Sequence, residues 1–106
     1  MQKTFLEKDE NLFSYVIDTF RSSACISLGK IQNPVTNKTD INLEQAEYYL
    51  DILLMLQTKT ENNLTDYEEQ MLINIVSELK MNFIEVKQSI ENIDVVSDSF
   101  STNKKK

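Results

Sequence analysis

Apolar residues recur along the chain at the three-to-four-residue spacing of amphipathic α-helices. The first such segment predicts a helix that begins near Asp9 to Asn11 and runs to Gly29, with a single apolar seam. The seam consists of Phe13, Ile17, Phe20, Ala24, Ser27 and Ile31. Gly29 is the only glycine, and it stands where a left-handed residue would end the helix. The chain also has one proline, and this scarcity of turn residues favours long helices over strands.

A second helix is predicted from Leu43 to about Thr60. Asn42 is its expected N-cap, with Gln45 three residues later as in a capping box. Its apolar seams consist of Leu43, Ala46, Leu50, Tyr49, Leu53 and Leu56. Residues 52–56 are apolar on every side of the helix, so we expect this turn to be mostly buried.

The segment between these helices, residues 30–42, is predicted to be a loop. Pro34 pushes Asn33 out of the helical region, and the neighbouring polar residues compete with regular structure. The loop is long for a helix–helix connection. We therefore expect it to lie along the bundle with three apolar side chains tucked in, which are Ile31, Val35 and Ile41.

The third helix is predicted to begin with Thr65 as N-cap and Glu68 as its reciprocal capping partner. Alternating steps of four and three residues then form a heptad seam. The seam consists of Leu72, Val76, Leu79, Phe83, Val86, Ile90 and Ile93. At 1.5 Å per residue this helix would be roughly 40 Å long and the second helix roughly 27 Å. We therefore expect its end to project past its neighbours with Val86, Ile90 and Ile93 still apolar.

These elements predict one small domain in a chain of 106 residues. Residues 1–10 are expected to be a flexible lead-in, residues 11–93 a single helical domain, and residues 94–106 a disordered polar tail. The predicted fold class is all-α, a three-helix antiparallel arrangement with a long first loop and an extended third helix. A chain of this size buries a modest core, so its stability is expected to depend on association.

A polar segment separates the second and third apolar runs, and helix-end chemistry accounts for each of its residue types. Residues 58–60 end the second helix, with Lys59 near its negative end. Asn62 or Asn63 adopts the left-handed conformation that stops this helix. Thr65 then begins the next helix. The segment is thereby interpreted as a connection between two helices.

The same segment also supports a functional hypothesis, a small anion site at a helix N-terminus. The candidate residues are Lys59, Thr60, Asn63 and Thr65. Three carboxylates, Asp66, Glu68 and Glu69, crowd that end of the helix and disfavour an anion. The structural interpretation is therefore preferred.

The first helix ends at Leu28 and Gly29, Pro34 follows, and after a leucine-rich helix comes a turn with Lys59, Thr60, Asn63, Leu64 and Thr65. These features resemble a bacterial family of small helical proteins, the domain of unknown function 1844. The family pattern has a Leu-Gly helix end, a following Pro, a leucine-rich helix, a Lys-Thr-x-Gly-Asn-Leu-Thr turn and a helix with Leu-Arg-Met. The matching residues are Leu28, Gly29, Pro34, Lys59, Thr60, Asn63, Leu64, Thr65, Leu79 and Met81. Asn62 replaces the family Gly and Lys80 replaces the family Arg, so a bidentate contact at position 80 cannot be essential. The resemblance extends from about Leu12 to Val86 and implies no known activity.

Charge and residue types narrow the function classes. The net charge is −6, and without the three terminal lysines eight basic residues would face 17 acidic ones. Such a surface repels phosphate backbones and anionic lipid, so we expect no nucleic-acid partner and no membrane partner. With a single Cys, no leader and no long apolar run, the chain is expected to be cytoplasmic.

The chain lacks the residues of the commonest catalytic sites. It contains no His, no Gly-rich phosphate loop and no CxxC, so we predict no enzyme activity and no cofactor. Glu44, Glu47 and Asp51 share one helical face and could bind a hard cation, although a solvated acidic face is the preferred interpretation. Cys25 is expected to be a small buried thiol rather than a reactive one activated by Arg21.

The leading hypothesis is a non-enzymatic protein–protein interaction module that self-associates, as a homodimer built on the third-helix seam and the apolar face of the second helix. The candidate interaction residues are Leu72, Val76, Leu79, Phe83, Val86, Ile90, Ile93 and Met55. A subunit of a heteromeric complex is the alternative, because the same seam would serve another protein equally well. A small-molecule or cation binder is the third hypothesis.

Overall fold

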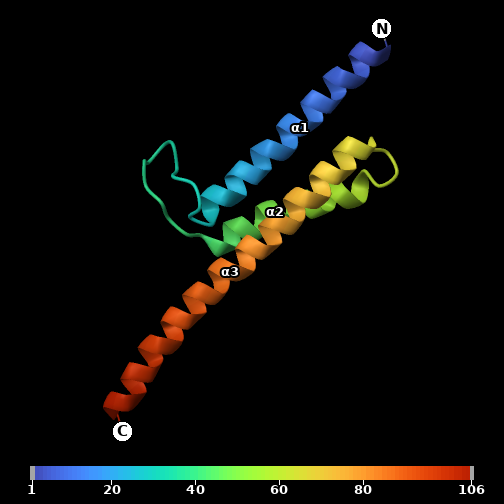
Figure 1. Cartoon of the computed structure of the whole chain (residues 1–106). Helices are drawn as coiled ribbons and strands as arrows, with labels where there is room; N and C mark the ends of the chain where they lie inside the picture. Colours follow the sequence, from blue (N-terminus) through green and yellow to red (C-terminus); the bar gives the residue numbers. More distant parts are fainter. Residues whose placement is uncertain (1, 106) are drawn as a thin grey trace.

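The computed structural model describes the backbone of residues 2–105 and the side chains of residues 7–92. It contains helices α1 (Gln2–Ser27), α2 (Leu43–Lys59) and α3 (Asp66–Lys105). Helices α1 and α3 run in the same direction and α2 runs back between them, so the two chain ends point away from each other (Figure 1). The predicted all-α class is confirmed, with three helices of which each is antiparallel to the next in the chain, a long first loop and an extended third helix.

Two helices are longer than the sequence pattern predicts. The predicted start near Asp9 to Asn11 is wrong, because α1 begins at Gln2, and α3 continues to Lys105. Neither extension contains a Gly or a Pro to interrupt a helix. The side chains of residues 1–6 and 93–106, which include Ile93, lie outside the described residues. The division into a flexible lead-in, a domain and a disordered tail therefore stays a prediction.

The 40-residue α3 is far longer than the 17-residue α2 that packs against it. At 1.5 Å per residue their lengths are about 60 Å and about 25 Å. The longest dimension of the molecule is 74 Å. The expectation that α3 projects past its neighbours is confirmed (Figure 1).

The core lies where the three helices meet. Its largest side chains with almost no exposed surface are Ile17 of α1, Leu53 of α2, and Leu72 and Leu79 of α3. Each helix places apolar residues on the face toward the other two, and burying such a side chain stabilises the fold by about 1.5–3 kcal/mol. The amphipathic spacing in the sequence therefore corresponds to one shared interior.

Polar contacts at the edge of this core fix how α1 lies beside α3. The hydroxyl of Ser14 donates to Sδ of Met71 at 3.5 Å, and two turns later Arg21 Nη2 lies 3.6 Å from Glu78 Oε1. The two pairs are separated by the same number of residues on both helices. This constant offset shows that α1 and the first half of α3 are parallel and in register.

Helix α1 ends in a Schellman motif at the single glycine. The N–H of Lys30 donates to the carbonyl of Cys25 at 2.9 Å, and the N–H of Gly29 donates to Ile26 at 3.0 Å. Gly29 has φ +73°, and a Cβ on it would lie 2.9 Å from Cγ1 of Ile41. The predicted left-handed helix end is confirmed. The loop returns so closely to the end of α1 that only glycine fits.

The apolar side chains of the loop do not lie against the bundle as the sequence predicts. Ile31, Val35 and Ile41 are 45%, 87% and 51% exposed. The loop instead closes on itself, since the N–H of Asn33 donates to Lys38 at 2.9 Å and the Asn33 side chain accepts from Val35 at 2.8 Å. These local bonds hold the tip of the loop, whereas its end returns to α1, where the N–H of Asn42 donates to the carbonyl of Ser27 at 2.8 Å.

Replacement of Gly29 by alanine should destabilise the fold by about 1–2 kcal/mol, because an L-residue is strained at this positive φ. The close approach of Ile41 adds to this cost. The measurement is the free energy of unfolding in urea. Ser22→Ala on the exposed side of α1 is the control and should change stability by less than about 0.5 kcal/mol. Equal stability of Gly29→Ala and the wild type would contradict the role of this turn.

Candidate functional site

The predicted interaction seam of α3 lies mainly in the interior of the chain. Leu72, Val76, Leu79 and Val86 are only 1–7% exposed, and Phe83 and Ile90 are partly buried against the same core. Val86 and Ile90 therefore pack against the core, although α3 extends beyond α2. Helices α1 and α2 cover the first half of α3. The sequence pattern shows that α3 has an apolar face, but it does not show which helix packs against that face. The four buried residues of this seam are not accessible to another protein while this core stays closed.

Among the candidate interaction residues with described side chains, Met55 is the one that is exposed. Its side chain is 45% exposed, while Leu53 in the same turn is fully buried. The expectation of a turn buried on most sides therefore holds for residues 52–56 except at Met55. Helices α1 and α3 pack against α2 and leave its far side open. Tyr48, two turns before Met55 on the same side of α2, is 64% exposed. Helix α2 therefore carries an outward apolar surface that the sequence pattern did not separate from its buried face.

Helix α1 extends this exposed surface. The rings of Phe20 and Tyr49 lie 6.3 Å apart, so the two antiparallel helices touch at this level. Val16 and Leu12, one and two turns before Phe20, are 44% and 55% exposed. Because α1 and α2 are antiparallel, residues that precede Phe20 on α1 lie beside residues that follow Tyr49 on α2, in the direction of Met55. We define the outer apolar patch as four exposed apolar side chains of these two adjoining helices, which are Leu12, Val16, Tyr48 and Met55.

The polar turn between α2 and α3 is built from helix ends, as its preferred interpretation predicts. The N–H and the hydroxyl of Thr60 both donate to the carbonyl of Leu56, at 3.0 and 2.6 Å. Asn62 has φ +68°, the left-handed conformation that stops α2. Asn62 therefore has the role that the sequence left open between two asparagines.

The capping box at the start of α3 is complete. The N–H of Glu68 donates to the hydroxyl of Thr65 at 3.2 Å, and the N–H of Thr65 donates to Glu68 Oε1 at 2.9 Å. The hydroxyl of Thr65 also donates to Oε2 of Glu10 at 2.9 Å. This last bond ties α1 to the start of α3. The sequence did not reveal it, because no local pattern connects residues so far apart.

The hollow beside this turn is not suited to an anion. Three of the four candidate turn residues line it, namely Thr60, Asn63 and Thr65, whereas Lys59 does not. The carboxylates of Asp9 and Glu10 line the same hollow. With carboxylates on its walls and its only candidate cation elsewhere, the hollow would repel a negative ligand.

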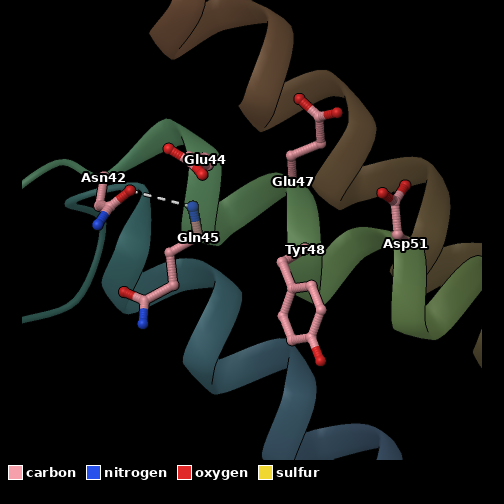
Figure 2. Close-up of a pocket in the computed structure, with 6 residues that line it drawn as sticks. All are labelled: Asn42, Glu44, Gln45, Glu47, Tyr48 and Asp51. Carbon is pink, nitrogen blue, oxygen red and sulfur yellow. Dashed lines mark hydrogen bonds between the residues drawn. The ribbon is translucent and has the colours of Figure 1, made fainter.

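The acidic face of α2 surrounds a second hollow, of about 540 Å³ and open to solvent (Figure 2). Glu47 and Asp51 point toward the α3 side of this face, and Tyr48 points toward the α1 side. Among the residues with described side chains, no three carboxylate or thiol groups come close enough to hold a metal ion. Glu44, Glu47 and Asp51 are all exposed, as expected of a solvated acidic face.

The predicted capping box of α2 is only half formed. Oδ1 of Asn42 accepts from the N–H of Gln45 at 3.0 Å (Figure 2). The Gln45 side chain does not return this bond, because its Oε1 accepts from the hydroxyl of Ser27 at 3.3 Å. The N–H of Asn42 donates instead to the carbonyl of Ser27 at 2.8 Å. A tertiary contact with α1 has thus replaced a local bond.

Cys25 is buried near the end of α1, with 8% of its surface exposed. Burial raises the pKa of its thiol, and the opposing effect of the nearby Arg21 cation is smaller. The thiol is therefore protonated at neutral pH and a poor nucleophile. This geometry agrees with the interpretation of Cys25 as a packing residue.

Comparison with known proteins identifies a family and no function. The model of the domain of unknown function DUF1844 matches residues 10–85. This range contains most of α1, all of α2, the polar turn and the first half of α3. No curated protein and no solved structure matches the chain. In the part of the chain that the structure describes, no helix is long and apolar enough to cross a membrane.

Thr65→Ala should lower the free energy of unfolding by about 1–2 kcal/mol, since it removes the N-cap of α3. The same change removes the bond to Glu10. Urea denaturation measures this loss. Thr65→Ser keeps the hydroxyl and is the matched control, with an expected loss of less than about 0.5 kcal/mol. If both variants lost stability equally, the hydroxyl would have no capping role.

The Cys25 thiol should react with a disulfide reagent at pH 8 more slowly in the native chain than in urea, by a factor on the order of ten or more. Its pKa is raised above the ordinary value of 9.0, so the folded state holds the thiol proton more tightly than the unfolded state. The stability that this provides is present below pH 9.0 and is lost as the pH rises through the raised pKa. Equal rates in the native and unfolded chains would contradict this burial. Cys25→Ala supplies the blank.

Proposed function

We propose that this chain, which belongs to the DUF1844 family, is a non-enzymatic protein–protein interaction module that self-associates. The observation that carries this proposal is the outer apolar patch. Its four large side chains, on two adjoining helices, are each 44–64% exposed. A patch that combines aliphatic, aromatic and methionine side chains has the composition of an interface centre.

Association would remove this surface from water. Transfer of apolar area out of water is favourable by about 25 cal/mol per Å². The chain is small, and in the part that the structure describes its three helices already form the core. No further helix of this part is available to cover the patch, so a partner would have to do so. Met55 and Tyr48 are also residues that adapt well to a partner surface.

The chemistry of the chain supports a binding role rather than catalysis. It has no His to act as a general base, and its single thiol is buried with a raised pKa. The carboxylates on α2 are exposed and solvated. A cell interior is the compartment that fits a lone reduced cysteine, so we place the module in the cytoplasm.

A second candidate function is that of a subunit in a heteromeric complex, and the loop favours it. Val35 is 87% exposed at a position held by the side chain of Asn33. An aliphatic side chain presented by an internally bonded loop suits insertion into another protein. A chain that is monomeric alone but co-purifies with one other protein in a fixed ratio would support this candidate.

Self-association should appear in sedimentation equilibrium as a mass of twice 12.3 kDa at micromolar concentration. Met55→Glu places a charge in the outer apolar patch and should weaken dimerisation by at least about tenfold. The control is Met81→Glu, at a side chain of α3 that is 71% exposed and outside the patch, and it should leave the dimer intact. A mass of 12.3 kDa at every concentration tested would rule out self-association.

A further inference from the structure

We infer that the self-association proposed above is an antiparallel two-fold pairing of α2 with α2 of a second copy, in one defined register. This inference rests on the proposed function and specifies its partner and geometry. The evidence is the order of charge and apolar surface along the outer side of α2.

Four residues follow one another along this outer side, at steps of four, seven and four positions. They are Glu44, Tyr48, Met55 and Lys59. These spacings place side chains on one face of a helix. All four are exposed, whereas Ala46 and Leu53 on the opposite side of the helix are at most 1% exposed. The stripe is therefore accessible to a partner along the length of α2.

The stripe has the symmetry that a two-fold contact requires. Its two ends carry opposite charges and its middle is apolar. Glu44 and Lys59 lie equally far from the midpoint between Asp51 and Ile52, at about 11 Å on either side by the rise per residue. Tyr48 and Met55 are equally far from that same point. A surface that binds its own copy across a two-fold axis must pair each residue with its counterpart in this way.

An axis through this midpoint places Glu44 opposite Lys59 of the second copy, and Tyr48 opposite Met55 of the second copy. Each contact occurs twice. The apolar pair brings a thioether against an aromatic ring, a favourable contact. Exposed ion pairs contribute little affinity, so the role of the charged pair is to select the direction and register.

The parallel arrangement is disfavoured by the same charges. It would bring Glu44 against Glu44 of the second copy and Lys59 against Lys59 of the second copy. It would also align the two helix dipoles, whereas the antiparallel pairing opposes them. Within the described side chains, the ion pairs are Arg21–Glu78 and Lys30–Glu85, so neither end of the stripe is already used inside the chain.

Asp51 opposes the pairing and provides a sensitive test of it. Its position beside the axis brings two copies of the carboxylate close together. The side chain points toward the α3 side of the stripe, where solvent screens part of the repulsion (Figure 2). Removing this charge should strengthen the dimer if the axis is placed correctly.

The experiment is sedimentation equilibrium of the full chain at low salt, with E44K, K59E and the double variant E44K/K59E. Each single change creates two like-charge contacts and should raise the dimer Kd by about tenfold. The double change exchanges the charges and should restore the Kd to within about threefold of the wild type. D51N should lower the Kd. E47K makes the same charge change away from the stripe, so the Kd is expected to change by less than about threefold.

The outcomes separate this inference from the proposed function. A wild-type dimer that responds equally to E44K and E47K, with no recovery in the double variant, would overturn the α2 pairing and leave self-association standing. A monomeric wild type would overturn the proposed function itself. All the changed residues are exposed, and circular dichroism of each variant establishes that it is folded before its Kd is compared.

Discussion

The whole arrangement depends on the burial of α2 on two of its sides. Leu53, at the middle of this short helix, has no exposed surface. It can be covered only if α1 and α3 both pack against α2, and they do so in parallel with each other. Because α2 has 17 residues and α3 has 40, the short α2 limits the length of the core and α3 extends beyond it.

The helix ends determine where this packing begins and stops. Gly29 ends α1 tightly enough for the loop to return beside it, and the N–H of Asn42 then bonds to Ser27. At the other end of the molecule, Thr65 caps α3 and binds Glu10 of α1. The two connections are therefore more than local turns, because each also joins α1 to the helix that follows the turn.

A helix covered on two sides has one side left, and on α2 that side carries Tyr48 and Met55 rather than only charged residues. This surface has the negative Glu44 at one end, the positive Lys59 at the other and apolar side chains between them. A two-fold rotation therefore places opposite charges together and apolar groups together. Tyr48 and Met55 stay 64% and 45% exposed, so neither α3 nor the loop covers this surface. The same packing that stabilises the single chain thus exposes the surface on which its proposed association depends.

The sequence by itself determined that there are three helices, both N-caps, the glycine stop and a left-handed asparagine after the second helix, because each depends on residues within one or two turns of chain. It did not determine where the first helix begins. Tertiary structure decided what those helices bury. The spacing of Val76, Leu79 and Val86 shows an apolar face but not whether its neighbour is another helix of the same chain or of another. Only packing turned Val86 inward and left Val35 and Met55 outside, since burial depends on contacts between residues far apart in sequence. Tertiary packing also decides the hydrogen bond from Thr65 to Glu10 and the hydrogen bond from Ser27 to the Gln45 side chain, because each joins residues far apart in sequence.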